Sequence, residues 1–287
     1  ALVQAFDDQA TGQIRALWVE QNIVTLTSML ADVKEAVHRV DPRIMLGKMT
    51  AGAEWTTYSG QAFDRWFTAL GASKARPGGG FYEDSKPIEM VPKALSCGRQ
   101  RVLLPDGVTD VQYELENFPY QRLKKSVTAV VDECSLALAY GLNGIAFNML
   151  GMTPNLENSV PWMAALPTVR PLWEAWTAHA AGLPTAGLWP AWSNRLMARR
   201  SVQTGESWLG WAPHHNVNQP NVLGEIGLPL AADTPACGTV LCGRVAEVFS
   251  DSELKTILSG GVLMDSIALE VLTERGLDHL TGVRRAQ

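Results

Sequence analysis

The chain has 287 residues, of which 46% are hydrophobic and 18% are charged, and its formal net charge is −5. This composition is typical of a globular protein with a sizeable core, and the interspersed charges exclude a strongly basic surface for nucleic acid or anionic membranes. No apolar run is long enough to cross a membrane, so we expect neither nucleic acid nor a membrane as a partner.

Helices and strands alternate in residues 1–183. Apolar residues at helical spacing predict helices over residues 12–40, 60–70, 85–97, 120–140 and 161–181. Shorter apolar or alternating runs predict strands over residues 43–50, 77–84, 109–120 and 144–150. Because the connections are short, we expect parallel strands. Four such units make half of an eight-stranded TIM barrel, and the leading helix indicates a barrel entered after its fourth strand.

The strand over residues 109–120 carries the candidate catalytic residues. Its polar residues, including Glu114 and Glu116, alternate with apolar ones, so the two kinds occupy opposite faces. Two glutamates on one face are costly to bury unless a site uses their charge, although an edge strand with a solvated acidic face gives the same pattern. Pro119 ends the strand and leaves Glu116 at its carboxyl end, where barrel enzymes place catalytic groups.

Residues 184–287 form a second unit, which begins after Gly182-Leu183-Pro184. Ser250 and Glu253 form a capping-box pattern that predicts the start of a helix running to Leu258. Strands are predicted over residues 186–189, 238–242 and 260–265, and further helices within 217–231 and over 266–275. We therefore expect a small open α/β sheet.

Two stretches of the barrel part resemble a known enzyme family. Glu116-Asn117-Phe118-Pro119, preceded by Gly78-Gly79-Gly80-Phe81-Tyr82, is similar to the β-galactosidase-like glycoside hydrolases of family 42 and their β-mannosidase relatives. The helix from Trp18 to His38 resembles the fourth barrel helix of that family. Residues 249–265 resemble its second domain, which is flavodoxin-like, is related to the glutamine-amidotransferase fold and carries trimer contacts.

The resemblance implies a retaining bacterial glycosidase of the β-galactosidase or β-mannosidase type, cytoplasmic, periplasmic or secreted, that cleaves a β-linked hexose. Such enzymes carry the acid/base Glu at the end of the fourth strand and the nucleophile at the end of the seventh. If the first strand here is the fifth, Glu116 is the nucleophile. The acid/base Glu then lies before Ala1, and an N-terminal half-barrel segment or second chain supplies it. The resemblance also implies a homodimer or homotrimer.

Further residues are expected to contact the carbohydrate. Glu114 lies two residues deeper in the barrel than Glu116 and is given a supporting role. The other candidates lie next to Glu116 or near strand ends and in the loops beyond them: Asn117, Tyr120, Tyr82, Glu83, Trp55 and Asn148. Two of these regions allow another interpretation. Asp84, at the same strand tip as Tyr82 and Glu83, is suited equally to contact sugar and to cap the next helix, and an aromatic in a loop such as that of Trp55 is more often part of the core.

Two other function classes fit parts of the sequence. A non-catalytic carbohydrate-binding or scaffold relative would keep the fold without the second carboxylate. A metal-dependent barrel hydrolase is disfavoured, because His214 and His215 are adjacent and no His-x-His pattern occurs at a strand end, so we expect no metal or cofactor. Amidotransferase chemistry needs a Cys on a strand-to-helix turn, whereas that turn reads Met264-Asp265-Ser266; we expect an assembly role for this domain.

Overall fold

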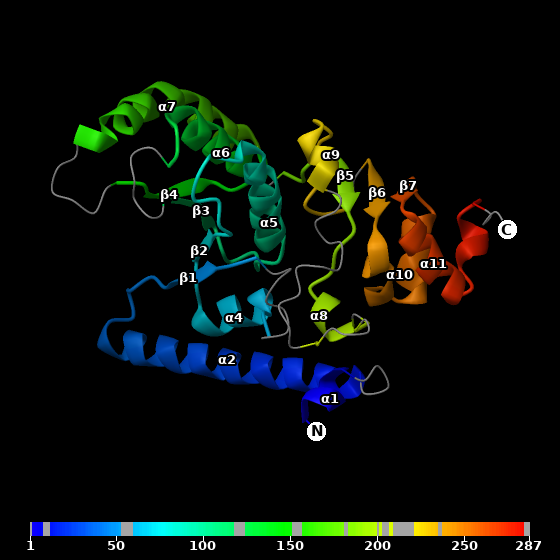
Figure 1. Ribbon diagram of the computed structural model, residues 1–287. Helices are drawn as coiled ribbons and strands as arrows, with labels where there is room; N and C mark the ends of the chain where they lie inside the picture. The colour runs from blue at the N-terminus through cyan, green and yellow to red at the C-terminus, as the bar shows by residue number, and fades with distance from the viewer. Residues whose placement is uncertain are drawn as a thin grey trace. The chain divides into compact units, whose positions relative to one another are not determined.

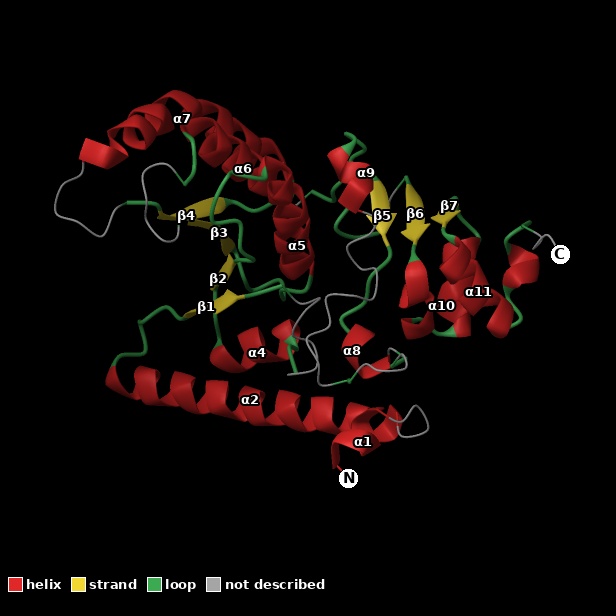
Figure 2. Cartoon of the chain, in the orientation of Figure 1, coloured by secondary structure: helices red, strands yellow, loops and turns green. Residues whose placement is uncertain are grey.

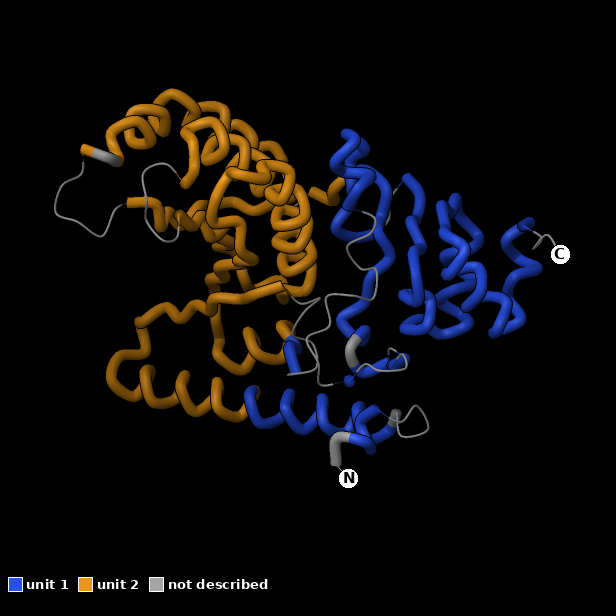
Figure 3. Tube along the Cα trace, viewed as in Figure 1, with its two compact units in different colours: residues 1–26, 53–62, 186–287 blue, residues 27–52, 63–185 orange. Residues whose placement is uncertain are grey.

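The computed structural model describes residues 2–7, 12–52, 60–117, 124–150, 157–180, 183–199, 201–202, 207–208, 221–234 and 237–283. The chain divides into two compact units (Figure 3). Unit 1 comprises residues 1–26, 53–62 and 186–287, and unit 2 comprises residues 27–52 and 63–185. Both units contain helices and a parallel sheet, which confirms the predicted α/β class. Because both units are discontinuous in sequence, they do not test the predicted division between residues 183 and 184.

Unit 2 is built on a four-stranded parallel sheet (Figure 1). Its strands are β1 (Gly47–Thr50), β2 (Lys74–Pro77), β3 (Asp110–Glu116) and β4 (Gly144–Asn148), and they lie side by side in chain order. The β2–β3 ladder is short, since only Lys74 and Ala75 have partners on β3, whereas the β3–β4 ladder runs to the end of both strands. The carboxyl end of β3 is therefore paired through β4 alone among the described strands.

Helices follow one side of this sheet, as Figure 2 shows. They are α4 (Phe63–Leu70), α5 (Met90–Val102), α6 (Val127–Ala139) and α7 (Val160–Ala180), with short 3-10 turns at Pro87–Glu89 and Glu157–Ser159. The core of unit 2 lies between helices and sheet, where Tyr113, Leu115, Cys97 and Cys134 are fully buried. The apolar face of β3 thus packs on α5 and α6.

Several predicted boundaries in unit 2 are wrong, and three of them affect the candidate site. The second strand is Lys74–Pro77 and not residues 77–84, because Gly80 and Phe81 both adopt positive φ angles and turn the chain. Helix α5 begins at Met90 instead of residue 85, which places Pro92 in its first turn, where no N–H is needed. Helix α6 begins at Val127 and not at residue 120, because the Ser126 side chain caps it by accepting from the Ala129 N–H.

Helix α2 (Gly12–Val40) has the predicted bounds but leaves most of its apolar residues exposed. Among its described side chains only Arg15 and Leu30 are buried. Six of the apolar positions that define its helical pattern are exposed: Ile14, Leu17, Trp18, Val24, Met29 and Val33. An apolar stripe of this length is more than scattered surface hydrophobes, and it is typical of a surface that contacts another segment.

Unit 1 contains a three-stranded parallel sheet in the order β5 (Leu188–Pro190), β6 (Gly238–Leu241) and β7 (Val262–Met264). Its helices are α1 (Leu2–Asp7), α8 (Leu196–Arg199), α9 (Asn221–Glu225), α10 (Asp251–Leu258) and α11 (Ser266–Glu274), with 3-10 turns at Gly243–Val248 and Asp278–Leu280. The sequence does not predict α1, whose Phe6 is buried and stacks on Trp208 with 5.2 Å between ring centroids. No helix in the described ranges is long and apolar enough to span a membrane.

The turn after β7, where an amidotransferase would carry its nucleophile, has a structural role here. Asp265 caps α11 by accepting from the Ala268 N–H at 2.8 Å and also accepts from the Gly243 N–H at 2.8 Å. Cys242 is half-buried, and burial followed by the charge of Asp265 raises the pKa of its thiol to about 11. A thiol with this pKa is a poor nucleophile at neutral pH.

The capping box at the start of α10 is confirmed, and it predicts an acid-dependent stability. Glu253 accepts hydrogen bonds from the Ser250 N–H and hydroxyl and from Arg195, which lower its pKa from 4.5 to about 2. Because the folded-state pKa is depressed, this stabilisation is present above pH 4.5 and is lost as the pH falls through about 2. We expect Glu253→Gln to lower the melting temperature at pH 7, with a difference from wild type that shrinks between pH 4.5 and 2. Glu225→Gln, at an exposed position, is the matched control.

Candidate functional site

The predicted alternation of β3 is confirmed by its burial. Val111, Tyr113 and Leu115 are buried toward the helices, whereas Glu114 and Glu116 lie on the opposite face and remain partly exposed. The strand ends at Glu116, before the predicted end at Pro119, and the predicted position of Glu116 at its carboxyl end is confirmed. Both carboxylates therefore lie on the same face, at the carboxyl end of a strand in a parallel sheet, which is where α/β proteins place ligand-binding groups.

Glu114 lies among groups that shift the pKa of its carboxyl group in opposite directions. Burial and the nearby charge of Glu116 raise its pKa, while Arg76 and Lys93 act to lower it. The Arg76 Nε lies 3.5 Å from the Glu114 Oε1. Gly78 makes room for this carboxylate, because a Cβ atom at position 78 would overlap its Oε2 atom. The first glycine of the Gly78-Gly79-Gly80 run is therefore required by the close approach of Glu114.

Tyr82 lies close enough to both carboxylates to respond to them. Burial, then Glu116 and Glu114, raise the pKa of its hydroxyl, which therefore stays protonated at neutral pH. The residue before it, Phe81, has a φ of 82°, an unfavourable conformation for a residue other than glycine. Its ring is anchored in a small hydrophobic cluster with Met90 and Ala129. This anchored turn determines where Tyr82 lies.

The remaining predicted site residues are distributed unevenly. Asn148 is exposed and pairs with Glu116 in the β3–β4 register, so it shares the candidate face. Asn117 is 1% exposed, and its Nδ2 donates to the Met149 carbonyl at 3.4 Å, which gives it contacts within the fold. The Glu83 carboxylate pairs with Lys124 and accepts from the Ser85 hydroxyl. Trp55 and Tyr120 lie outside the described residues.

Asp84 does not have the capping role that the sequence suggests for it. Its Oδ2 accepts a hydrogen bond from the Ser126 N–H at 2.7 Å, and Ser126 is the residue that caps α6. Asp84 therefore ties the loop after β2 to the start of α6, and does not cap the helix that follows it in sequence.

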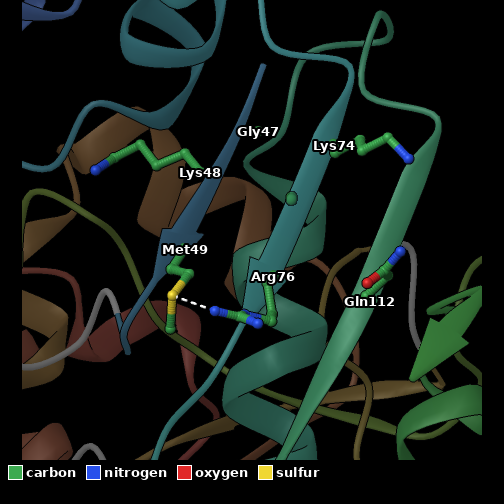
Figure 4. A pocket seen from close by; sticks show the side chains of 7 residues that line it. Gly47, Lys48, Met49, Lys74, Arg76 and Gln112 are labelled. Carbon is green, nitrogen blue, oxygen red and sulfur yellow. Dashed lines mark hydrogen bonds between the residues drawn. The ribbon is translucent and has the colours of Figure 1, made fainter. Parts of the chain in front are cut away.

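A cavity of about 230 Å³ lies across β1, β2 and β3 (Figure 4). It is lined by Gly47, Lys48, Met49, Lys74, Ala75, Arg76 and Gln112. The cations that line it have partners: Lys74 donates to Asp110 at 2.7 Å, Arg76 contacts the Met49 sulfur, and the Lys48 ammonium lies 5.0 Å from the Trp66 ring centroid. Neither Glu114 nor Glu116 lines this cavity, so the candidate catalytic groups lie beyond it along β3.

Sequence reasoning missed a buried ionic cluster on the helix-covered side of β3. Glu133 of α6 is 0% exposed and accepts from Lys93 at 3.0 Å, from Lys125 at 2.6 Å and from the Tyr113 hydroxyl at 2.7 Å. Burial lowers the pKa of Lys125, and the Glu133 carboxylate acts in the opposite direction. The sequence offers one indication of this burial. Glu133 follows Val130 by three residues and precedes Ala137 by four, so it lies on the same face of α6 as these buried residues.

No group of three His, Cys, Asp or Glu residues suited to a metal ion occurs among the residues that the structure describes. The groups that the described residues place on the candidate face are carboxylates, a phenol and an arginine. No protein-family model, curated protein or solved structure matches this chain.

Proposed function

We propose that the chain is part of a retaining glycoside hydrolase that cleaves a β-linked hexose, of the β-galactosidase or β-mannosidase type, with Glu116 as the nucleophile. The observation that carries this proposal is the position of Glu116 at the carboxyl end of β3, on the same partly exposed face as Glu114. A retaining mechanism needs a carboxylate that attacks the anomeric carbon from one side of the sugar.

The neighbours of Glu116 support this role. Tyr82 keeps its proton and is therefore a hydrogen-bond donor for a sugar oxygen or for the nucleophile itself. Glu114 is paired with Arg76, so it is a hydrogen-bond acceptor in an arrangement fixed before substrate binds. Asn148 comes from the adjacent strand and offers both a donor and an acceptor on the same face. Sugar recognition depends on groups of this kind.

The four-stranded sheet supports the proposal of a half-barrel. Its strands are parallel and in chain order, and helices follow one side of it, as in a TIM barrel. A second segment with four strands, carrying the acid/base Glu, would complete the barrel. The β5–β7 sheet with its helices is proposed to be a flavodoxin-like domain that acts in assembly of a dimer or trimer.

The function can be tested with aryl β-galactosides and aryl β-mannosides on the enzyme purified together with its partner segment. We expect release of the aryl group from one of the two series and a first-formed sugar product that keeps the β configuration in NMR spectra. A first product with the α configuration would rule out the double displacement. No release from either series would favour a non-catalytic carbohydrate-binding relative.

A further inference from the structure

The buried cluster of Lys93, Lys125 and Glu133 is not explained by stability of the fold. All three side chains are at most 2% exposed, and two ammonium groups face one carboxylate. Removing such charges from water is costly, and buried ion pairs replaced by apolar residues of similar volume are often neutral or stabilising. A buried cluster in which two lysines share one carboxylate therefore calls for a reason beyond packing.

The surplus donors of the two lysines are directed at the backbone of the candidate site. Lys93 donates to the Glu114 carbonyl at 2.9 Å, and Lys125 donates to the Glu116 carbonyl at 2.7 Å. These are the carbonyls of the two glutamates on the candidate face. Each ammonium group thus donates one hydrogen bond to Glu133 and another to a backbone carbonyl of β3, the strand that carries the candidate catalytic groups.

Lys125 also holds the turn that precedes Tyr82. It donates to the Phe81 carbonyl at 2.8 Å, and its ammonium lies 4.6 Å from the centroid of the Phe81 ring. The β2–β3 ladder involves only Lys74 and Ala75 of β2, so it does not reach this level of β3. Lys125 therefore connects the chain beyond β2 to the end of β3 at a point where no ladder bond between the two strands occurs among the described residues.

We propose that Lys93, Lys125 and Glu133 are positioning residues that fix the backbone of residues 114–116 and 81–82, and through it the placement of Glu116 and Tyr82. The catalytic half of this inference rests on the proposed function, whereas the backbone half does not. Glu133 orients the two ammonium groups, and the ammonium groups hold three carbonyls: those of Glu114, of Glu116 and of Phe81, the residue before Tyr82. A displacement of about 1 Å at such a site costs roughly 100-fold in rate.

The test compares Lys125→Met and Lys93→Met, which keep most of the side-chain volume, in the complete enzyme. Leu138→Ala is the control, because Leu138 is buried on α6 and its side chain takes no part in the hydrogen bonds and ion pairs of the cluster. Hydrogen exchange followed by mass spectrometry reports on the backbone without any need for activity. We expect faster exchange in peptides that cover residues 80–83 and 114–117 for Lys125→Met, and in residues 114–117 for Lys93→Met, with β1 unchanged.

Turnover provides the second measurement. We expect both lysine variants to lower kcat by about 10- to 100-fold with KM changed by less than about threefold, while Leu138→Ala lowers the melting temperature and keeps kcat. Unchanged exchange in both peptides would overturn the proposal, as would faster exchange with wild-type kcat. A wild-type enzyme that hydrolyses no glycoside would refute the proposed function, while the exchange data would still decide whether the cluster holds this backbone.

Discussion

Replacing Glu116 with Gln is expected to lower kcat/KM on an aryl β-glycoside by several orders of magnitude, because an amide cannot form the covalent glycosyl intermediate. The loss should appear in kcat, since the amide keeps the size and much of the hydrogen bonding of the carboxylate. Steady-state kinetics on the complete enzyme measure it directly. Because Glu116 is partly exposed at the end of β3, the substitution should leave the melting temperature close to that of the wild type.

Glu114→Gln is the matched control for this prediction, since Glu114 is a second carboxylate on the same face and strand. We expect it to keep part of the turnover, because Glu114 supports the site through Arg76 and does not attack the sugar. Glu116→Ala opens space for a small anion, so azide should restore some turnover and give a glycosyl azide of inverted configuration. Wild-type activity in Glu116→Gln would contradict the assignment of the nucleophile.

The polar face of β3 can be predicted from sequence because successive side chains of a strand point to opposite faces of the sheet, and helices cover only one of these faces. The helix side is fully buried at Tyr113 and Leu115, while the opposite side leaves Glu114 and Glu116 in partial contact with solvent. Pro119 is equally local information, and it places the end of the strand close to Glu116. This is why the candidate nucleophile can be placed correctly at a strand terminus before its surroundings are known.

The segment 78–82 shows where local pattern fails. Three glycines and two aromatics indicate a close backbone approach, and Gly78 does make one, but toward the Glu114 side chain. A strand through this segment is excluded by the positive φ of Phe81, which Lys125 and the packing of the Phe81 ring stabilise. Lys125 is distant in sequence, and a residue that stabilises a local conformation from far away leaves no local signal.

The buried lysines could not be found from sequence for a related reason. Because lysine is rarely fully buried, the sequence predicts that the Lys93 side chain lies in solvent. Its burial depends on Glu133, which lies 40 residues later on another helix. The spacing of apolar residues describes each helix separately and does not show which residues of two helices meet. In the folded chain α5 packs against α6, and this packing brings Lys93 and Glu133 together.

The chain is expected to require a partner segment for activity, because closure of a barrel needs eight strands and the described part of unit 2 provides four. The partner should pair with β1 at one edge of the sheet and with β4 at the other. Neither edge strand has an outer partner among the described strands, and Met49 and Phe147 are 51% and 43% exposed, so the sheet by itself is prone to association. Without the partner, we expect aggregation on a size-exclusion column with mass detection.

Met49→Lys is the variant that probes this interface most sharply. Met49 lies on the same face of the sheet as Arg76, its register partner on β2, so a new charge there would be buried by a closed barrel. We expect loss of co-purification with the partner and of glycosidase turnover together. Val102→Lys, at an exposed position at the end of α5, is the control and should keep both.

The partner is also expected to determine the distance between the two catalytic carboxyl groups. A retaining mechanism needs a second carboxyl group about 5 Å from the nucleophile, and the partner is expected to bring a Glu to that distance from Glu116. A structure of the complete enzyme measures the separation, and the corresponding Glu→Gln variant should lose turnover chiefly on substrates with poor leaving groups, since these need protonation. A partner-free monomer that turns over an aryl β-glycoside would refute the requirement, because it would have to hold both carboxyl groups itself.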